Sequence, residues 1–330
     1  MANAVNGNDF FEGTEKLLEV WFGSTTDAKT ADLRNIDRSF WESLLEKVNC
    51  QIISCKSIDG LDAYVLSESS MFISRNRFIL KTCGRTTLLH AVDSLLKQAK
   101  EELGFDTIAD VFYSRKNFLR PELQPQIHQT FEDEVTHLDE IFDDGAAYAL
   151  GRLNADCWYL YTLDIVGVEE PDQTIELLMS DLDPEIMSIF TIEKCKTGAE
   201  ATKMSGIDKL IPGAIIDDFQ FDPCGYSMNG LLPETKYFTI HITPEEGFSY
   251  VSFESNVEQK CYQQLLNMLI DTFKPGKVLA TLFANNTSYA SDSLKLFERD
   301  EPLPNFKCSD RQFCRFKNYN LVYAHFKKNG

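Results

Sequence analysis

The chain has 330 residues, enough for a large hydrophobic core and for about two domains by length alone. Hydrophobic residues make up 43% of it and charged residues 25%, a composition that excludes an intrinsically disordered protein. The 51 acidic residues against 32 Lys and Arg give a formal net charge of -19, which disfavours nucleic acid and anionic membranes as partners and suits a cationic ligand.

The cysteines and the N-terminal residues indicate a cytoplasmic protein. There are nine cysteines, an odd number with no C-x-x-C pair, which favours reduced thiols over a disulfide framework. The first residues lack a basic stretch followed by an apolar run, and no segment is apolar enough to span a bilayer. The five histidines are scattered and no zinc or nucleotide-binding motif occurs, so no metal is expected.

In chain order, the first elements mix helix and strand. Phe10–Phe22 is dense in apolar residues whose period fits either a strand or a helix, and Gly23–Ala31 is predicted to be a loop. Asp37 can cap a helix with apolar residues at helical spacing, namely Phe40, Trp41, Leu44, Leu45 and Val48. Short β-rich runs follow at Gln51–Ser54, Ala63–Ser67, Met71–Ser74 and Phe78–Thr82.

The later elements repeat this order. Thr86–Glu102 has helical periodicity, and Val111–Ser114 is predicted to be a strand. The second half again gives strands, a helix and a strand, at Tyr237–Thr243, Phe248–Phe253, Gln259–Phe273 and Val278–Phe283. The repeat predicts an internal duplication within a single domain over residues 1–330, and the polar segment Glu193–Leu210 is predicted to be a surface excursion.

One short segment, Glu68-Ser69-Ser70, is by itself only a polar turn between two predicted strands. Its surroundings carry more information. Four segments together closely resemble the eukaryotic S-adenosylmethionine decarboxylases: Tyr64–Phe72, Phe78–Gly84, Pro223–Gly230 and Ile240–Glu245. The resemblance spans most of the chain to about Phe283 and is weaker from Asn285 onward. It also includes Phe10–Phe22, Tyr113–Phe118, Cys157–Thr162 and Pro171–Met179.

This resemblance implies both a fold and an activity. The fold is α+β, a four-layer α/β/β/α sandwich of two mainly antiparallel sheets with internal duplication. The activity is decarboxylation of S-adenosyl-L-methionine to S-adenosylmethioninamine, the aminopropyl donor for spermidine and spermine synthesis. Animal relatives are usually homodimers of an αβ unit, so a homodimer is expected here.

The same resemblance implies that the chain cuts itself between Glu68 and Ser69. The Ser69 hydroxyl would attack the Glu68 carbonyl and convert the amide to an ester, helped by a strained turn. Ser227 would stabilise the oxyanion or ester, and His241 would remove the Ser69 α-proton. β-Elimination would then leave a β chain of residues 1–68 and an α chain of residues 69–330.

The resemblance further implies a covalent cofactor made from the chain. Ser69 would become a pyruvoyl group that forms a Schiff base with the substrate and accepts its electrons, so no external cofactor is needed. Cys83 would protonate the product, although a lone Cys at a strand end is more often a buried structural thiol. Glu12 and Glu15 are expected near the catalytic group.

Substrate recognition is expected to combine aromatic and acidic residues. Adenine is a flat π surface and the sulfonium is a cation, and aromatic rings suit both. By resemblance Phe11 and Phe221 would stack on the adenine and Glu245 would bind the ribose hydroxyls. Glu12 and Glu68 would add polar contacts near the nucleoside.

A second site for putrescine, as an activator, is expected from an acidic cluster that family members share. A dication relieves the repulsion between buried carboxylates. The acidic members are Glu19, Asp172, Glu176 and Glu254. The residues expected to line the site or relay its effect are Lys16, Lys81, Thr174 and Phe283.

Two other interpretations stay open at this point. The chain could be a catalytically dead paralogue that acts as the regulatory subunit of a true decarboxylase, which the intact Ser69, Cys83, Ser227 and His241 argue against. It could also be an acidic binding protein without chemistry, which would leave the joint presence of these residues unexplained.

Overall fold

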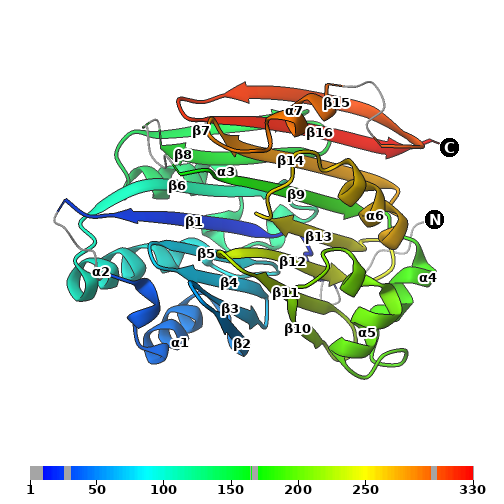
Figure 1. The fold of residues 1–330 in the computed structure, drawn as a ribbon, viewed down its shortest axis with the longest axis horizontal. Helices are drawn as coiled ribbons and strands as arrows, with labels where there is room; N and C mark the ends of the chain where they lie inside the picture. The colour runs from blue at the N-terminus through cyan, green and yellow to red at the C-terminus, as the bar shows by residue number, and fades with distance from the viewer. Residues whose placement is uncertain (1–9, 26–30, 164, 166–169, 299–302, 330) are drawn as a thin grey trace.

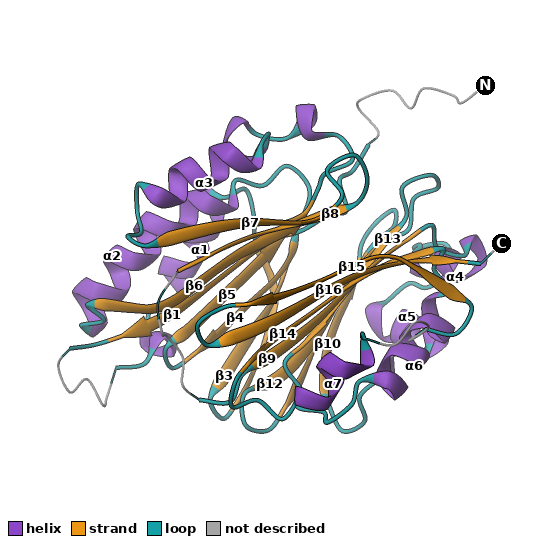
Figure 2. Ribbon diagram, turned by 90° about the horizontal axis from the view of Figure 1, so that it is seen from above, coloured by secondary structure: helices purple, strands orange, loops and turns teal. Residues whose placement is uncertain are grey.

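Two eight-stranded sheets lie face to face, and helices cover the outer face of each (Figure 1, Figure 2). The structure is a computed structural model that describes residues 10–25, 31–163, 165, 170–298 and 303–329. Neighbouring strands in both sheets pair antiparallel. The expected four-layer α/β/β/α sandwich is therefore confirmed.

The first sheet is built from the N-terminal half and has the strand order β2-β3-β4-β5-β1-β6-β8-β7. Its strands are β1 Lys16–Gly23, β2 Ile52–Ile58, β3 Leu61–Leu66, β4 Ser69–Ser74, β5 Arg77–Thr82, β6 Thr107–Lys116, β7 Gly145–Gly151 and β8 Cys157–Leu163. The α-helices that cover it are α1 Arg38–Lys47, α2 Val92–Leu103 and α3 Phe131–Asp139 (Figure 2).

The second sheet repeats this topology. Its order, β10-β11-β12-β13-β9-β14-β16-β15, is the first order with eight added to every strand number, so the predicted duplication is confirmed. Its strands are β9 Gln173–Ser180, β10 Ile215–Gln220, β11 Tyr226–Leu232, β12 Lys236–Thr243, β13 Tyr250–Ser255, β14 Lys277–Asn285, β15 Phe306–Arg315 and β16 Tyr319–Lys328. The α-helices of this half are α4 Pro184–Met187, α5 Gly198–Ser205, α6 Gln263–Phe273 and α7 Ser291–Leu296.

Several predicted elements differ in detail. The ambiguous N-terminal segment is a strand that begins only at Lys16. Asp37 occupies the cap position of α1, but its side chain makes no capping hydrogen bond. The predicted helix Thr86–Glu102 is a 3-10 turn, Leu88–Ala91, followed by α2, and α6 begins at Gln263 rather than Gln259.

The segment Glu193–Leu210 is not a plain surface excursion. It contains α5, and its apolar residues Cys195, Ala201, Ile207 and Leu210 are buried against the second sheet because they fall on one side of this helix and the turns around it. Of the predicted loop Gly23–Ala31, residues 26–30 lie outside the described residues.

The two faces of each sheet carry different chemistry. Along β1 the even-numbered Leu18 and Val20 join the apolar core beneath the helices, while the odd-numbered Glu19 lies between the sheets. This alternation follows from the two-residue period of a strand. Because polar and charged side chains accumulate between the sheets, the functional residues of both halves can meet there.

Helix α6 provides a test of the outer core. Leu266 is fully buried between α6 and the second sheet, so Leu266→Ala should lower the free energy of unfolding by about 2–5 kcal/mol. Urea denaturation measures this. The control Gln264→Ala, at an exposed position of the same helix, should change it by less than about 0.5 kcal/mol. Equal effects of the two variants would contradict the packing described here.

Candidate active site

The turn between β3 and β4 holds Ser69 in an unusual backbone conformation. Its φ angle is 122°, a region that residues with a Cβ rarely adopt. The side chain is 2% exposed, and its hydroxyl donates a 2.9 Å hydrogen bond to Glu15 Oε1. The turn thus presents a buried, oriented hydroxyl immediately after the Glu68 carbonyl.

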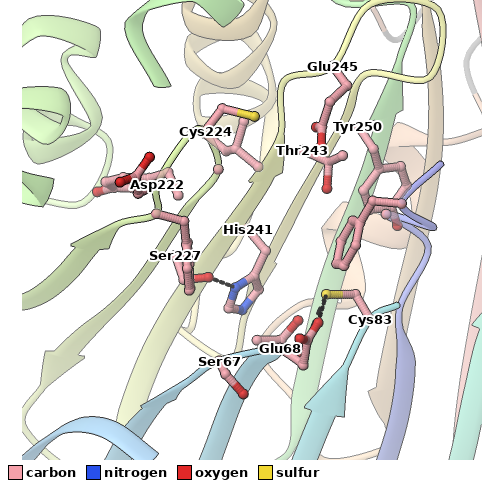
Figure 3. A pocket seen from close by; sticks show the side chains of 17 residues that line it. Ser67, Glu68, Cys83, Asp222, Cys224, Ser227, His241, Thr243, Glu245 and Tyr250 are labelled. Atoms are coloured by element: carbon pink, nitrogen blue, oxygen red, sulfur yellow. Dashed lines mark hydrogen bonds between the residues drawn. The ribbon is translucent and has the colours of Figure 1, made fainter. Parts of the chain in front are cut away.

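The facing sheet contributes a histidine whose two ring nitrogens both have hydroxyl partners. Ser227 on β11 lies opposite His241 on β12, and Ser227 Oγ is 2.9 Å from His241 Nδ1 (Figure 3). His241 Nε2 is 2.8 Å from Thr239 Oγ1 and 3.2 Å from Ser70 Oγ. Ser70 also donates to Asn229 Oδ1 at 2.7 Å, so these bonds connect the β4 turn to the second sheet.

Cys83, just after β5, lies beside the same turn. Its amide donates to the Glu68 carbonyl at 3.0 Å, and its thiol lies 3.5 Å from that oxygen and 3.8 Å from Glu68 Oε2 (Figure 3). Burial and the neighbouring carboxylates Glu68 and Glu15 raise the pKa of the Cys83 thiol well above its usual value. The thiol is therefore protonated at neutral pH.

Burial also sets the charges of the acidic groups here. It raises the pKa of Glu68 to about 7 and raises that of Glu15, although Lys81 at 3.4 Å from Glu15 acts in the opposite direction. The same burial, together with Lys81, lowers the pKa of His241 to about 3. The imidazole is thus a neutral base near neutral pH.

These residues line a cleft of about 760 Å³, open space at its mouth included. Phe11, Phe221 and Glu245 line it too, and Glu245 Oε2 has no hydrogen-bond partner among the described residues. The full lining is Phe11, Gly13, Ser67, Glu68, Ser69, Cys83, Phe221, Asp222, Cys224, Gly225, Tyr226, Ser227, His241, Ile242, Thr243, Glu245 and Tyr250. Glu12 is not part of it, because its carboxylate accepts from the amides of Thr14, Leu119 and Arg120.

A separate inter-sheet cavity, of about 480 Å³ with all adjoining open space included, contains most of the predicted activator residues. It is lined by Leu17, Glu19, Phe112, Ser114, Trp158, Leu160, Asp172, Thr174, Glu176, Glu254, Thr281 and Phe283. Lys81 adjoins it, with Nζ 2.9 Å from both Glu176 and Glu254. Every acidic residue expected in the activator site is therefore gathered here.

Lys16 does not belong to this group, contrary to the expectation. As an even-numbered residue of β1 it lies on the helix side of the sheet, where its amine donates to the Gly84 carbonyl at 3.3 Å and to Gln124 at 3.4 Å. Burial lowers the pKa of Lys16 to about 8. Its contact with the Gly84 carbonyl supports the turn that carries Cys83.

Sequence reasoning missed three residues that complete these sites: Arg77, Asn229 and Thr239. Strand alternation could have found them. Thr239 and Asn229 stand two residues from His241 and Ser227 on the same strands, and Arg77 stands four residues before Lys81, so each pair shares a face. The predicted strand at Phe78–Thr82 began one residue too late to include Arg77.

A family profile described as adenosylmethionine decarboxylase matches residues 8–327, nearly the whole chain. The chain belongs to the adenosylmethionine decarboxylase family. The match includes residues after Asn285, where the resemblance seen in the motifs was weakest.

Relatives within this family are similar over their full length. The S-adenosylmethionine decarboxylase proenzyme of Drosophila melanogaster is 52% identical over 98% of this chain and 98% of its own. The S-adenosylmethionine decarboxylase proenzyme of Xenopus laevis is 51% identical over 97% of this chain and 96% of its own. A solved Trypanosoma brucei AdoMetDC-delta26 monomer has a TM-score of 0.60 at 23% identity, covering 79% of this chain and 99% of its own, and so supports the fold.

The described residues contain no group of three or more His, Cys, Asp or Glu side chains placed to hold a metal ion. Within the same residues, every helix is too short or too polar to cross a membrane.

Because the His241 imidazole is buried, we expect the stability of the protein to depend on pH. Its folded pKa of about 3 lies below the unfolded value of about 6.5, so the unfolded chain binds the extra proton between these values. Its contribution to the unfolding free energy should therefore fall as pH drops below about 6.5, by at most about 1.4 kcal/mol per unit. Nitrogen NMR, with His241→Asn to assign the resonance, should show no titration from pH 5 to 8. A midpoint near pH 6.5 would refute the buried neutral state.

Proposed function

We propose that this chain decarboxylates S-adenosyl-L-methionine to S-adenosylmethioninamine for polyamine synthesis, using a pyruvoyl group that it makes from Ser69. The observation that carries the proposal is the convergence of Ser69, Cys83, Ser227 and His241 on one cleft, although the last two come from the other half of the duplication. Family membership gives this convergence its chemical meaning.

In the proposed self-processing, the Ser69 Oγ attacks the Glu68 carbonyl carbon and the amide becomes an ester. Glu15, which accepts from the Ser69 hydroxyl, holds that oxygen in place, and the strained φ angle is relieved as the turn reacts. Ser227 stabilises the oxyanion, and neutral His241, oriented by Thr239 and Ser227, removes the Ser69 α-proton.

Elimination then breaks the ester C–O bond and releases the β chain, residues 1–68, ending in the Glu68 carboxylate. The dehydroalanine left at position 69 takes up water and loses ammonia, giving the α chain, residues 69–330, with its pyruvoyl terminus. When present, that group supplies an electron sink for the electrons released with carbon dioxide.

Cys83 then protonates the product carbon. A thiol is a suitable acid only if it is protonated before the reaction, and burial beside two carboxylates ensures this. Its contacts with Glu68 hold the thiol next to residue 69.

Substrate binding is assigned to the outer part of the cleft. Phe11 and Phe221 present aromatic surface for the adenine and the sulfonium, with Glu68 as a polar neighbour. Glu245 has an unpartnered carboxylate oxygen for the ribose hydroxyls. Glu12 is left out of this assignment because backbone amides already occupy its carboxylate.

We assign the inter-sheet cavity to putrescine as activator. Five buried carboxylates meet there or next to it. Among the described residues, the Lys and Arg side chains that pair with them are Lys81 and Arg77, so a dication complements the charge. The carboxylates are Glu15, Glu19, Asp172, Glu176 and Glu254. Lys81 joins Glu176 and Glu254 to Glu15, which contacts Ser69, and this provides the route of activation.

A regulatory role as a dead paralogue is the second candidate, and the complete set of reacting residues disfavours it. A homodimer of αβ units is proposed from the family resemblance, and a cytoplasmic location is proposed from the odd number of cysteines without a C-x-x-C pair.

The cleavage proposal predicts the fate of a nucleophile variant. Ser69→Ala removes the attacking oxygen, so denaturing mass spectrometry should find one intact 37.6 kDa chain. The wild type, incubated with putrescine, should give two chains. Ser67→Ala lies in the same turn and is the control that should still be cut. Intact wild-type chain after prolonged incubation would rule out self-processing.

The activator proposal predicts the behaviour of Asp172→Val. Loss of this carboxylate removes a charge partner of the dication, so decarboxylation should no longer rise with added putrescine, while basal activity persists. The control Asp208→Val removes an exposed acid far from the cavity and should respond like the wild type. Equal responses of the Asp172 variant and the wild type would contradict the site assignment.

A further inference from the structure

A third cavity, of about 1580 Å³ with the open solvent at its mouth included, lies at the opposite end of β4 from Ser69. Its lining includes Ser74 at the end of β4, so it lies roughly 17 Å along the strand from Ser69. We call it the vestibule and define it by Trp21, Arg77, Asp172, Glu234, Tyr237 and Glu258. Its rim reaches the surface, because Glu234 and Glu258 are exposed.

The vestibule adjoins the inter-sheet cavity, whereas the catalytic cleft does not. Asp172 lines both the vestibule and the inter-sheet cavity. The catalytic cleft shares no lining residue with the inter-sheet cavity. Between those two lies the buried ion cluster in which Lys81 contacts Glu15, Glu176 and Glu254. A charged ligand coming from the cleft would have to break this cluster.

Arg77 stands at the boundary between the vestibule and the inter-sheet cavity. It is 8% exposed, lines the vestibule, and places Nε 2.8 Å from Glu19 and Nη1 3.6 Å from Asp172. Its guanidinium also lies 4.5 Å from the Trp21 ring, and its Nη2 has no hydrogen-bond partner among the described residues. The guanidinium therefore covers two of the acids assigned to the activator without being held on every side.

We propose that the diamine enters through the vestibule and that Arg77 is its gate. This inference rests on the putrescine site proposed above. Arg77 occupies Glu19 and Asp172 as a tethered cation while it stacks on Trp21, and the arriving ammonium competes with it for these two carboxylates. The competition lowers apparent affinity, because only the fraction of molecules with an open gate can bind.

The rim and the walls of the vestibule suit this ligand. The rim carries charges of both signs, because Arg34, Arg75 and Lys236 also line it and Lys236 pairs with Glu258 at 2.7 Å. Glu234 and Glu258 are exposed, so the attraction that they exert on a dication is partly offset by these cations and weakens with salt. Further in, the Trp21 ring already carries the Arg77 guanidinium on its face, so this position accommodates a cation.

Two of the chain's three tryptophans report on entry. Trp21 contacts Glu19 and Arg77, and Trp158 lines the inter-sheet cavity and donates to Glu176. Stopped-flow tryptophan fluorescence after mixing with putrescine therefore measures its association rate in the whole protein.

The first experiment reverses the charge of two acidic residues at the rim of the vestibule and, as a control, of two acidic residues near the catalytic cleft. Glu234→Lys with Glu258→Lys should slow putrescine association by about threefold or more at low salt, with a smaller effect at high salt. The matched control is Glu46→Lys with Glu246→Lys, the same charge change near the catalytic cleft, and it should leave the rate unchanged. The opposite pattern, or no effect of either pair, overturns the route.

The second experiment removes the gate. Arg77→Met deletes the competing cation, so association should become about fivefold faster or more and half-activation should need less putrescine, whereas Arg77→Lys should behave nearly like the wild type. Unchanged association in Arg77→Met overturns the gate. The failure of the activator site itself looks different, because then putrescine changes neither the fluorescence nor the activity of the wild type.

Discussion

Both the cleft and the inter-sheet cavity depend on the ion pairs of the Lys81 ammonium. It is fully enclosed between the sheets and is shared by Glu15, Glu176 and Glu254, one carboxylate from the first half and two from the second. Two opposite unit charges about 4 Å apart attract each other by roughly 4 kcal/mol at an effective dielectric constant near 20, before the cost of desolvation is subtracted. Three acids hold the pKa of Lys81 well above its usual value, so the charge is permanent.

One cation cannot satisfy three carboxylates equally. Lys81 and the Tyr237 hydroxyl lower the pKa of Glu254, whereas burial raises the pKa of Glu15 and Glu176. A change in charge on the Glu176 side therefore alters how strongly Lys81 attracts Glu15. Since Glu15 orients the Ser69 hydroxyl, the cluster couples the inter-sheet cavity to the cleft through two contacts.

Much of this could be read from sequence because strand and helix periods reflect burial on one face. The order of elements and the duplication were predicted from that signal, and the family motifs brought Ser69, Cys83, Ser227 and His241 together. What could not be read were polar contacts between residues far apart in the sequence. The face of the sheet on which Lys16 lies depends on where β1 begins. The sequence did not show where it begins, because the run Phe10–Phe22 is apolar throughout most of its length.

Glu12 shows the same limit, and so does the partner of Arg77, although strand alternation places Arg77 itself on the same face as Lys81. The carboxylate of Glu12 accepts from the amides of Leu119 and Arg120, more than a hundred residues away, and no local pattern reveals such a partner. Arg77 pairs with Asp172 across the sheets in the same way. A polar contact between two distant residues needs only one residue from each segment. It therefore produces no repeating pattern in the sequence, unlike the apolar face of a helix or strand.

The backbone at residue 69 has a consequence that outlasts processing. A φ angle of 122° is unfavourable for serine because its α-carbon is tetrahedral and carries a Cβ on a fixed side. In the proposed conversion that carbon becomes a planar ketone with no amide nitrogen before it, so the angle and its penalty cease to exist. Under this proposal the turn suits the group that residue 69 would become better than it suits serine, and the reverse reaction would have to rebuild a conformation that serine resists.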